Sequence, residues 1–459
     1  MAARPPRSFF QGPENEDELS SEAMHTISFD EAVSNHVTGT DGQFQATRVT
    51  TTVAPVVVRQ HAIPGGAPRY QEASGYSFLF NSPKYPGLCA MDDGTLVLTL
   101  TVALTGEVVV QEEDGIVRTF VDEGTRDDVI LSSHDGVEWS QPVAIPGYRT
   151  TPMNLGGDRL LLRGWTSKMD VPETFVLWFS SDRGKTWSEA EDVAPLPDGR
   201  RVITDVSPNM LIEGDLVHWL FMVESLPDSD WGAETCLRTY NHVTHSWKEP
   251  FFFPEAWIRF GRTSEASLCR AGNGDMVASF RSGRPGPSQL PADKWRGLVT
   301  ATSADDGRSW SDPVVHSLYA HVHSSLLRLA DDRILLTYAV RLGEIDGQLY
   351  HGHEAVLSHD HGQTFDWAHR FVLFRGTDGA MHSPQSVQLP LSPGTADPRI
   401  LTVVMHPISY TWRGDEDAQT TGTANLTGLS NVSCVVWSPG DRSPGAVLPP
   451  SCLVGGARL

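Results

Sequence analysis

The segment SADDGRSW, at Ser303–Trp310, decides how this chain of 459 residues folds. Its pattern, Ser-x-Asp-x-Gly-x-Ser/Thr-aromatic, returns as SSDRGKTW at Ser180–Trp187 and as SHDHGQTF at Ser358–Phe365. In such a turn Asp accepts backbone N–H groups, Gly supplies a positive φ, and the aromatic ring packs beneath. Each copy follows an apolar stretch, so the pattern predicts a turn at the end of a β-strand. We therefore expect these aspartates to form turns rather than to bind metal or catalyse.

Two weaker copies of the pattern extend the series. SSHDGVEW, at Ser132–Trp139, has His134 at the Asp position, and YNHVTHSW, at Tyr240–Trp247, keeps only the final Ser-Trp pair. The turn is thus expected in five places along the chain, which indicates an internal repeat.

A second repeat is interleaved with the first, and it consists of an apolar strand, a tight turn and another apolar strand. The six copies read CAMDDGTLVLTL, MNLGGDRLLL, NMLIEGDLVHWLFM, LCRAGNGDMVASF, LLRLADDRILLTY and VQLPLSPGTADPRILTVVM. Their turns lie at Gly94, Gly157, Gly214, Gly274, Asp332 and Thr395, so that successive turns are 63, 57, 60, 58 and 63 residues apart. Six units of about 60 residues, each with about four antiparallel strands, predict an all-β, six-bladed β-propeller.

The repeat also predicts the domain organisation. We expect one propeller domain over 46–441, with blades at 76–146, 147–200, 201–258, 259–318, 319–376 and 377–441. The β-rich stretch within 46–60 is expected to add a closing strand to the last blade. Residues 1–45 are expected to form a flexible acidic tail, and 442–459 a C-terminal tail.

Composition excludes several other classes of protein. The formal net charge of −22, from 35 basic and 57 acidic residues, argues against nucleic acid as a partner, because phosphate binding needs clustered Lys and Arg. The five cysteines show no CxxC spacing, so neither a disulfide framework nor a zinc site is predicted. The longest apolar run is far shorter than the roughly 18 residues that span a membrane, and the N-terminus lacks the apolar core of a signal sequence. We expect a cytoplasmic protein without a membrane partner, although secretion through a signal of another kind stays open, as does the oligomeric state.

The Ser-x-Asp-x-Gly turns are Asp-boxes, or BNR repeats, and residues 76–441 resemble the sialidase (neuraminidase) superfamily of six-bladed β-propellers. The segment SEASLCRAGNGDMVASFR is similar to the family's stretch in which a Glu precedes a strand–turn–strand and an Arg follows it, here Glu265 and Arg281. LLTYAVR places Arg341 where the family has another carboxylate-binding arginine. The resemblance implies an axial pocket for an anionic sugar, with Glu265 in a catalytic role and both arginines on the sugar carboxylate.

The chain departs from the family pattern at two places. Lys84-Tyr85-Pro86 stands where the family has Arg-Ile-Pro, so that Lys84 replaces a guanidinium fork with a point charge. The segment GAMHSPQSVQL, in which the family's nucleophilic tyrosine falls, contains no tyrosine, and His382 or Ser383 occupies its place. We predict His382 as a catalytic residue, while Tyr85 and Tyr338 are kept as alternative nucleophiles. No motif selects the general acid among the acidic residues of the first blade, which are Glu112, Glu113, Asp114, Asp122 and Glu123.

Histidines and arginines complete the predicted site. His321, His323, His382 and His406 are expected at strand ends around one funnel, where imidazole suits acid–base work near neutral pH. The predicted substrate-binding residues are Arg281, Arg341, Lys84, Arg163 and His323. The His-x-His motif at 321 and 323 has no identifiable third ligand, so we expect no metal and no cofactor.

These residues favour a sialidase-like glycoside hydrolase, an exo-α-sialidase or a related enzyme, that removes an anionic sugar from the non-reducing end of a glycan. Arginines that neutralise a uronate together with a histidine base would equally suit a polysaccharide lyase. The absence of the family's tyrosine favours a third hypothesis, a non-catalytic glycan-binding propeller.

Overall fold

The structure is a computed structural model of the chain. It describes residues 47–53, 69–71, 73–79, 84–103, 108–113, 116–121, 126–136, 138–166, 175–200, 202–204, 210–224, 233–253, 264–281, 298–316, 321–345, 348–367, 369–376, 384–390, 398–407 and 430–439. The regular elements in these ranges are β-strands, and no helix among them is long and apolar enough to cross a membrane. Both predicted tails lie outside the described residues.

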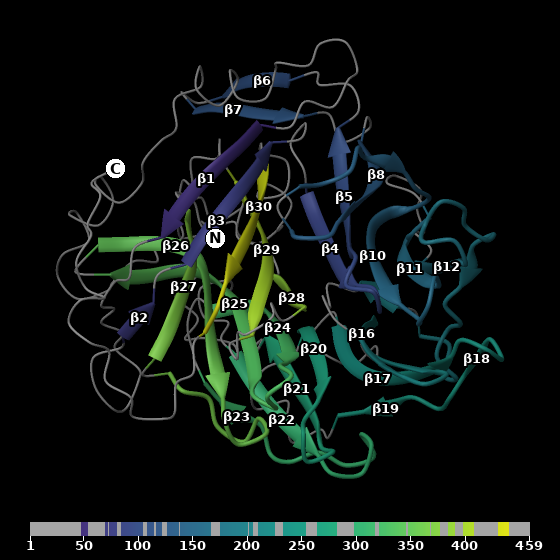
Figure 1. The fold of residues 1–459 in the computed structure, drawn as a ribbon. Helices are drawn as coiled ribbons and strands as arrows, with labels where there is room; N and C mark the ends of the chain where they lie inside the picture. The colour runs from purple at the N-terminus through teal and green to yellow at the C-terminus, as the bar shows by residue number, and fades with distance from the viewer. Residues whose placement is uncertain are drawn as a thin grey trace, which may run out of the picture.

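Six sheets follow one another around a ring in chain order, which confirms the predicted six-bladed β-propeller (Figure 1). Blade 1 contains β4 (Lys84–Ala90), β5 (Leu96–Ala103), β8 (Arg126–Ser133) and β9 (Val143–Ala144). Blade 2 contains β10 (Tyr148–Asn154), β11 (Leu160–Trp165), β12 (Phe175–Ser180) and β13 (Glu191–Asp192). Blade 3 contains β14 (Val202–Thr204), β15 (Leu211–Glu213), β16 (Leu216–Glu224), β17 (Ala233–Asn241), β18 (Ser246–Trp247) and β19 (Phe251–Phe252).

The second half of the ring has the same plan. Blade 4 contains β20 (Ser264–Arg270), β21 (Met276–Arg281), β22 (Leu298–Ser303) and β23 (Val314–Val315). Blade 5 contains β24 (His321–Arg328), β25 (Ile334–Ile345), β26 (Gln348–Ser358) and β27 (His369–Gly376), with β2 (Arg69–Gln71) parallel to β27. Blade 6 contains β28 (Gln385–Leu389), β29 (Arg399–Pro407) and β30 (Ser430–Trp437). A separate hairpin of β6 (Val108–Glu113) and β7 (Ile116–Val121) leaves blade 1 between β5 and β8.

The N-terminal strands join the last blade and bring the two ends of the ring together. β3 (Ala73–Leu79) pairs with β30, and β1 (Thr47–Val53) pairs with β3 at the outer edge of the same sheet. In Figure 1 the purple strands β1 and β3 lie beside the yellow strand β30. The closing strand was expected within 46–60. β1 does enter this sheet, but β3 is the strand that contacts β30, and 54–60 lie outside the described residues.

The hydrophobic core is divided among the six interfaces between neighbouring blades. Alternation along a strand explains this, because successive side chains point to opposite faces of a blade. Along β5, Leu96, Leu98 and Leu100 pack against blade 6, whereas Val97 packs against blade 2. Comparable clusters join blades 2 and 3, 3 and 4, 4 and 5, and 5 and 6. A strand in this fold is therefore apolar on both faces, which explains the long apolar runs in the sequence.

The Asp-box turns have the structural role expected from the sequence. In blade 4, Asp305 accepts hydrogen bonds from the Ser309 amide (2.8 Å) and hydroxyl (2.6 Å), and the Gly307 amide donates to Ser303 Oγ (2.9 Å). The boxes of blades 2 and 5 have the same bonds. These bonds lower the pKa of Asp305 to about 2. The carboxylate of Asp305 is therefore engaged in hydrogen bonds within the turn.

The first-blade box differs from the alignment made on sequence. Asp135, and not His134, is the turn aspartate, because it accepts the Glu138 amide (2.8 Å) and the Ser133 hydroxyl (3.1 Å). This box is one residue shorter than the others, so counting back from the aromatic residue selected the wrong position. In blade 3, Asn241 takes the acceptor role and binds the amides of Val243 and Thr244.

Candidate active site at the bulge end

Four innermost strands share one irregularity near their first residue. β4, β10, β20 and β24 each have a register shift there, and one residue inside each shift has a positive φ. These residues are Tyr85 (φ 50°), Arg149 (54°), Glu265 (45°) and His323 (53°). Bulges of this kind re-aim side chains and are common next to active sites. A non-glycine residue held at positive φ costs on the order of 1–3 kcal/mol of conformational energy. We call the end of the propeller that holds these four residues the bulge end.

Three of the predicted site residues meet at the bulge end of blades 4 and 5. Arg281, the last residue of β21, donates from Nη1 to Glu265 Oε1. His323 Nδ1 lies 3.1 Å from the other carboxylate oxygen, Oε2. The exposed fractions of the three side chains are only 4% for Arg281, 11% for Glu265 and 3% for His323. A carboxylate, a guanidinium and an imidazole therefore share one largely desolvated cluster, where charge interactions are stronger than in water.

Buried hydroxyl groups fix the backbone beneath this cluster. Ser279 Oγ and Ser324 Oγ lie 2.8 Å apart and join β21 to β24. The Leu326 amide donates to Ser267 Oγ (2.8 Å), which joins β24 to β20. Both contacts cross the interface between blades 4 and 5. The two bulges are thus held in a fixed relation, which is the preorganisation that a site for chemistry requires.

A second pair of bulge residues meets in blades 1 and 2. The guanidinium carbon of Arg149 lies 4.3 Å from the ring centroid of Tyr85 and 5.1 Å from that of Tyr148. The two tyrosine rings meet edge to face at 6.2 Å. These distances are in the range of cation–π contacts.

The sequence analysis did not identify Arg149. The signal was present, because each of the four bulge residues stands eight or nine positions before the turn residue of its hairpin. Aligning the hairpins at their turns would have brought Arg149 within one position of Glu265.

The other predicted residues lie apart from the cluster or beyond what is described. Arg163 is 2% exposed within β11, its guanidinium lies 5.3 Å from the Trp219 ring, and burial lowers its pKa to about 9. Lys84 begins β4, and Arg341 lies in β25 where the pairing with β26 shifts, but their side chains fall outside the described part of the structure. His382 lies outside the described residues altogether, as do the side chains of the acidic candidates in blade 1.

Tyr338 is not a substitute nucleophile. Its side chain is fully buried in the second strand of blade 5, and its hydroxyl donates to Glu354 Oε2 at 2.5 Å. Burial and the neighbouring carboxylate raise its pKa well above the usual range. Tyr85, in contrast, is partly exposed at the bulge end.

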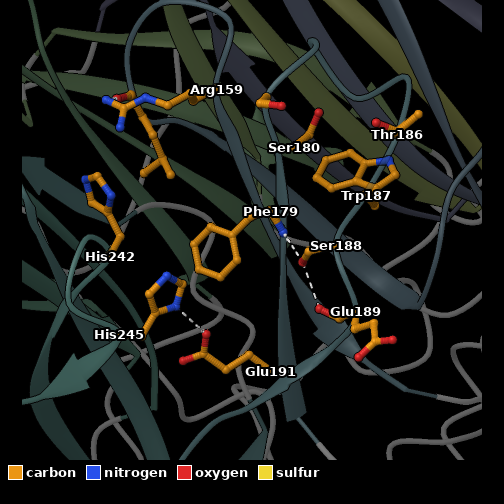
Figure 2. Close-up of a pocket in the computed structure, with 12 residues that line it drawn as sticks. Arg159, Phe179, Ser180, Thr186, Trp187, Ser188, Glu189, Glu191, His242 and His245 are labelled. Carbon is orange, nitrogen blue, oxygen red and sulfur yellow. Dashed lines mark hydrogen bonds and ion pairs between the residues drawn. The ribbon is translucent and has the colours of Figure 1, made fainter.

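A groove of about 600 Å³ lies at the opposite end of blades 2 and 3 (Figure 2). Phe179 and Trp187 line it, and Glu191 contacts His245 across it at 2.6 Å. Part of its wall is the Asp-box of blade 2, and it contains none of the predicted site residues. We therefore place the candidate site at the bulge end. Within the described ranges, no group of three or more His, Cys, Asp or Glu is arranged to hold a metal ion.

No known protein family matches this sequence, and no curated protein matches it. Solved structures do match. A protein of unknown function from Dyadobacter fermentans is 18% identical, with a TM-score of 0.50 over 84% of this chain and 98% of that one. The α-L-arabinofuranosidase Arb93A from Fusarium graminearum is 12% identical, with a TM-score of 0.51 over 78% and 93% of the two chains. The NanB sialidase from Streptococcus pneumoniae is 11% identical, with a TM-score of 0.38 over 72% and 70%. At these identities the likeness establishes the fold, and the chain is similar in fold to proteins that include glycosidases.

Proposed function

We propose that this protein is a glycan-active enzyme, a glycoside hydrolase that removes an acidic sugar from the non-reducing end of a glycan at the bulge end of the propeller. The observation that carries the proposal is Glu265, which lies between Arg281 and His323 at the strand ends of two adjoining blades. A carboxylate that is nearly buried and fixed by two neighbours is typical of a preorganised site.

Each member of the cluster has a distinct part in this chemistry. The carboxylate of Glu265 stabilises positive charge that develops on the sugar ring as the glycosidic bond breaks, or orients the group that attacks it. The guanidinium of Arg281 holds that carboxylate in place through its ion pair. The imidazole of His323 lies close enough to exchange a proton with it or with a bound sugar hydroxyl.

The fold supports glycan chemistry in a general way. Arb93A is an arabinofuranosidase on a similar fold, at a TM-score of 0.51. That likeness does not select the sugar. The acidic sugar is inferred from Arg281, from the resemblance of the Glu265–Arg281 segment to sialidases, and from Arg341.

A panel of fluorogenic glycosides tests the proposal, with sialic acid, glucuronic acid and arabinofuranose as the released sugars. We expect turnover of one of the two acidic glycosides. Arg281→Ala and Arg341→Ala should each abolish it while thermal unfolding shows a folded protein. Arg328→Gln is the matched control, because Arg328 is 41% exposed and pairs with Asp332 at the opposite end of blade 5. Full activity in both site variants would contradict the assignment of the protein as a hydrolase of acidic sugars.

A lyase is the second candidate, and the position of His323 favours it. An imidazole 3.1 Å from a carboxylate is a suitable base for removing the proton next to a uronate carboxyl group. A lyase would produce an unsaturated uronate, which is detected by its ultraviolet absorbance on incubation with uronate-containing polysaccharides. No such absorbance on any of them would exclude this alternative, and saturable sugar binding without turnover would indicate the non-catalytic propeller.

A further inference from the structure

We infer that Arg149 is a carboxylate-binding residue for the acidic sugar, and that Tyr85 forms the wall against which that sugar lies. The inference rests on the proposed function and deepens it, because it names a second anion-binding group on the opposite side of the propeller axis. It comes from the backbone repeat, the contacts of Arg149 and the charge of the Glu265 cluster.

The two pairs of bulge residues lie in blades on opposite sides of the ring. Tyr85 and Arg149 begin the innermost strands of blades 1 and 2, whereas Glu265 and His323 begin those of blades 4 and 5. In a ring of six blades, blades 1 and 2 lie opposite blades 4 and 5 (Figure 1). A sugar held on the axis would therefore have Glu265 on one side and Arg149 on the other.

The residue types at the bulges point to side-chain function. Where only the backbone matters, a position with positive φ is taken by Gly, or by Asn or Asp. At its turns the chain has Gly94, Gly274 and Gly307 at φ of 83°, 94° and 81°, but three Asp-boxes also have Arg183, Asp306 and His361 at φ of 61°, 60° and 62°. The side chains of Arg183 and Asp306 are exposed, whereas Glu265 and His323 are nearly buried and contact each other. A large side chain that is kept at a conformational cost and is also turned inward is the expected result if it contacts a ligand.

Charge explains why an arginine is needed in blade 2. The ion pair with Glu265 partly offsets the positive charge that Arg281 offers to a sugar carboxylate. Arg149 adds a second guanidinium on the other side of the axis. Its guanidinium contacts the faces of Tyr85 and Tyr148, whereas a carboxylate is recognised by the in-plane N–H edge of the group. Ring stacking and carboxylate binding are thus compatible in the same residue.

A buried carboxylate holds the Arg149 bulge in place. Asp128, on β8 of blade 1, is 1% exposed and accepts the Thr150 amide (2.7 Å) and hydroxyl (2.5 Å). Thr99 donates to the Thr150 carbonyl (2.7 Å), which adds a second link from blade 1. The residue that follows Arg149 is therefore fixed by three hydrogen bonds from the neighbouring blade. This is the rigid support expected beneath a binding side chain.

Direct binding measurements test the inference independently of catalysis. Isothermal titration calorimetry would compare free N-acetylneuraminic acid and glucuronic acid with glucose, on the full-length protein and on Arg149→Gln and Arg149→Lys. We expect the wild type to prefer an acidic sugar. Arg149→Gln should weaken acidic-sugar binding at least tenfold and leave glucose binding unchanged, and Arg149→Lys should lose less because it keeps the charge. Arg328→Gln serves again as the surface control.

The possible failures can be told apart. If Arg149→Gln binds the acidic sugar as well as the wild type does, while Arg281→Ala does not, the role of Arg149 is wrong and the proposed function stands. If the wild type shows no preference for an acidic sugar, both the role of Arg149 and the acidic-sugar assignment fail. Thermal unfolding of each variant, compared with the wild type, excludes a fold defect as the cause of lost binding.

Discussion

The two ends of this propeller repeat in different ways. At the Asp-box end, blades 2, 4 and 5 repeat both the backbone and the residue types, with Ser, Asp, Gly and Ser or Thr making the same hydrogen bonds each time. At the bulge end, four blades repeat the backbone but carry Tyr, Arg, Glu and His. A structural requirement acts equally on every blade, whereas a single ligand needs a different group from each side. The contrast predicts that substitutions at the Asp-box end act on stability and that those at the bulge end act on the proposed function.

The largest effect is expected from Glu265→Gln at the bulge end. Gln keeps the shape and one acceptor for Arg281 but removes the negative charge on which the proposed chemistry depends. We expect a loss of kcat of about 10²–10³-fold, the usual effect of removing one group that stabilises charge in the transition state. Initial rates on the acidic glycoside that the wild type cleaves measure this loss, and circular dichroism checks the fold. An activity within threefold of the wild type would place the chemistry elsewhere.

Gly307→Ala tests the opposite end and should affect stability alone. Gly307 has φ of 81°, and an added Cβ would collide with Leu237 of the neighbouring blade. We expect a loss of about 2–3 kcal/mol in the free energy of unfolding, from strain plus the clash. Gly274→Ala is the matched control, since φ is 94° there but nothing lies within 4 Å, so it should lose only about 1 kcal/mol. Urea unfolding gives both values. Reduced turnover per folded molecule in either variant would break the separation of the two ends.

Acid should affect the two ends in different pH ranges. Burial lowers the pKa of His321, at the start of β24, to about 3, so that it stays neutral when folded but takes up a proton when unfolded below its usual value of 6.5. Stability from His321 is therefore present above pH 6.5 and decreases as the pH falls, by about 2 kcal/mol at pH 5. The pKa of Asp305 is also lowered, from 3.8, so the Asp-box end loses stability only below about that pH.

His321→Gln removes the imidazole whose protonation is expected to lower stability between pH 6.5 and pH 5. It therefore tests whether the loss of stability in that pH range comes from His321. The unfolding free energy of both proteins is compared at pH 7 and at pH 5. We expect it to fall more in the wild type than in the variant. Urea unfolding at both pH values measures it. An equal loss in the two proteins would mean that His321 is not buried as a neutral imidazole.

The fold was predictable from sequence because two separate patterns repeat along the chain, the strand–turn–strand hairpins and the Asp-boxes. The site was harder to predict. Glu265 and Arg281 could be found because they flank one hairpin, whose pairing brings them together. Arg149 was missed because the features that mark it are a positive φ and contacts with another blade. Likewise, the sequence does not show whether the Tyr338 side chain is accessible. Its hydrogen bond to Glu354 in the structure shows that it is a core residue.

The smallest expected change in stability belongs to Arg149→Gly, and it tests the premise of the comparison. Gly accepts the φ of 54° at this position without strain, and this gain offsets the lost contact with Tyr85, which is worth about 0.5–1 kcal/mol. We expect an unfolding free energy within about 1 kcal/mol of the wild type. Arg149→Ala loses the same contact but keeps the strain, so it should be less stable than Arg149→Gly, which is the reverse of the order in ordinary strands. If Ala proves the more stable of the two, the bulge is not strained, and its side chains are not kept there at a conformational cost.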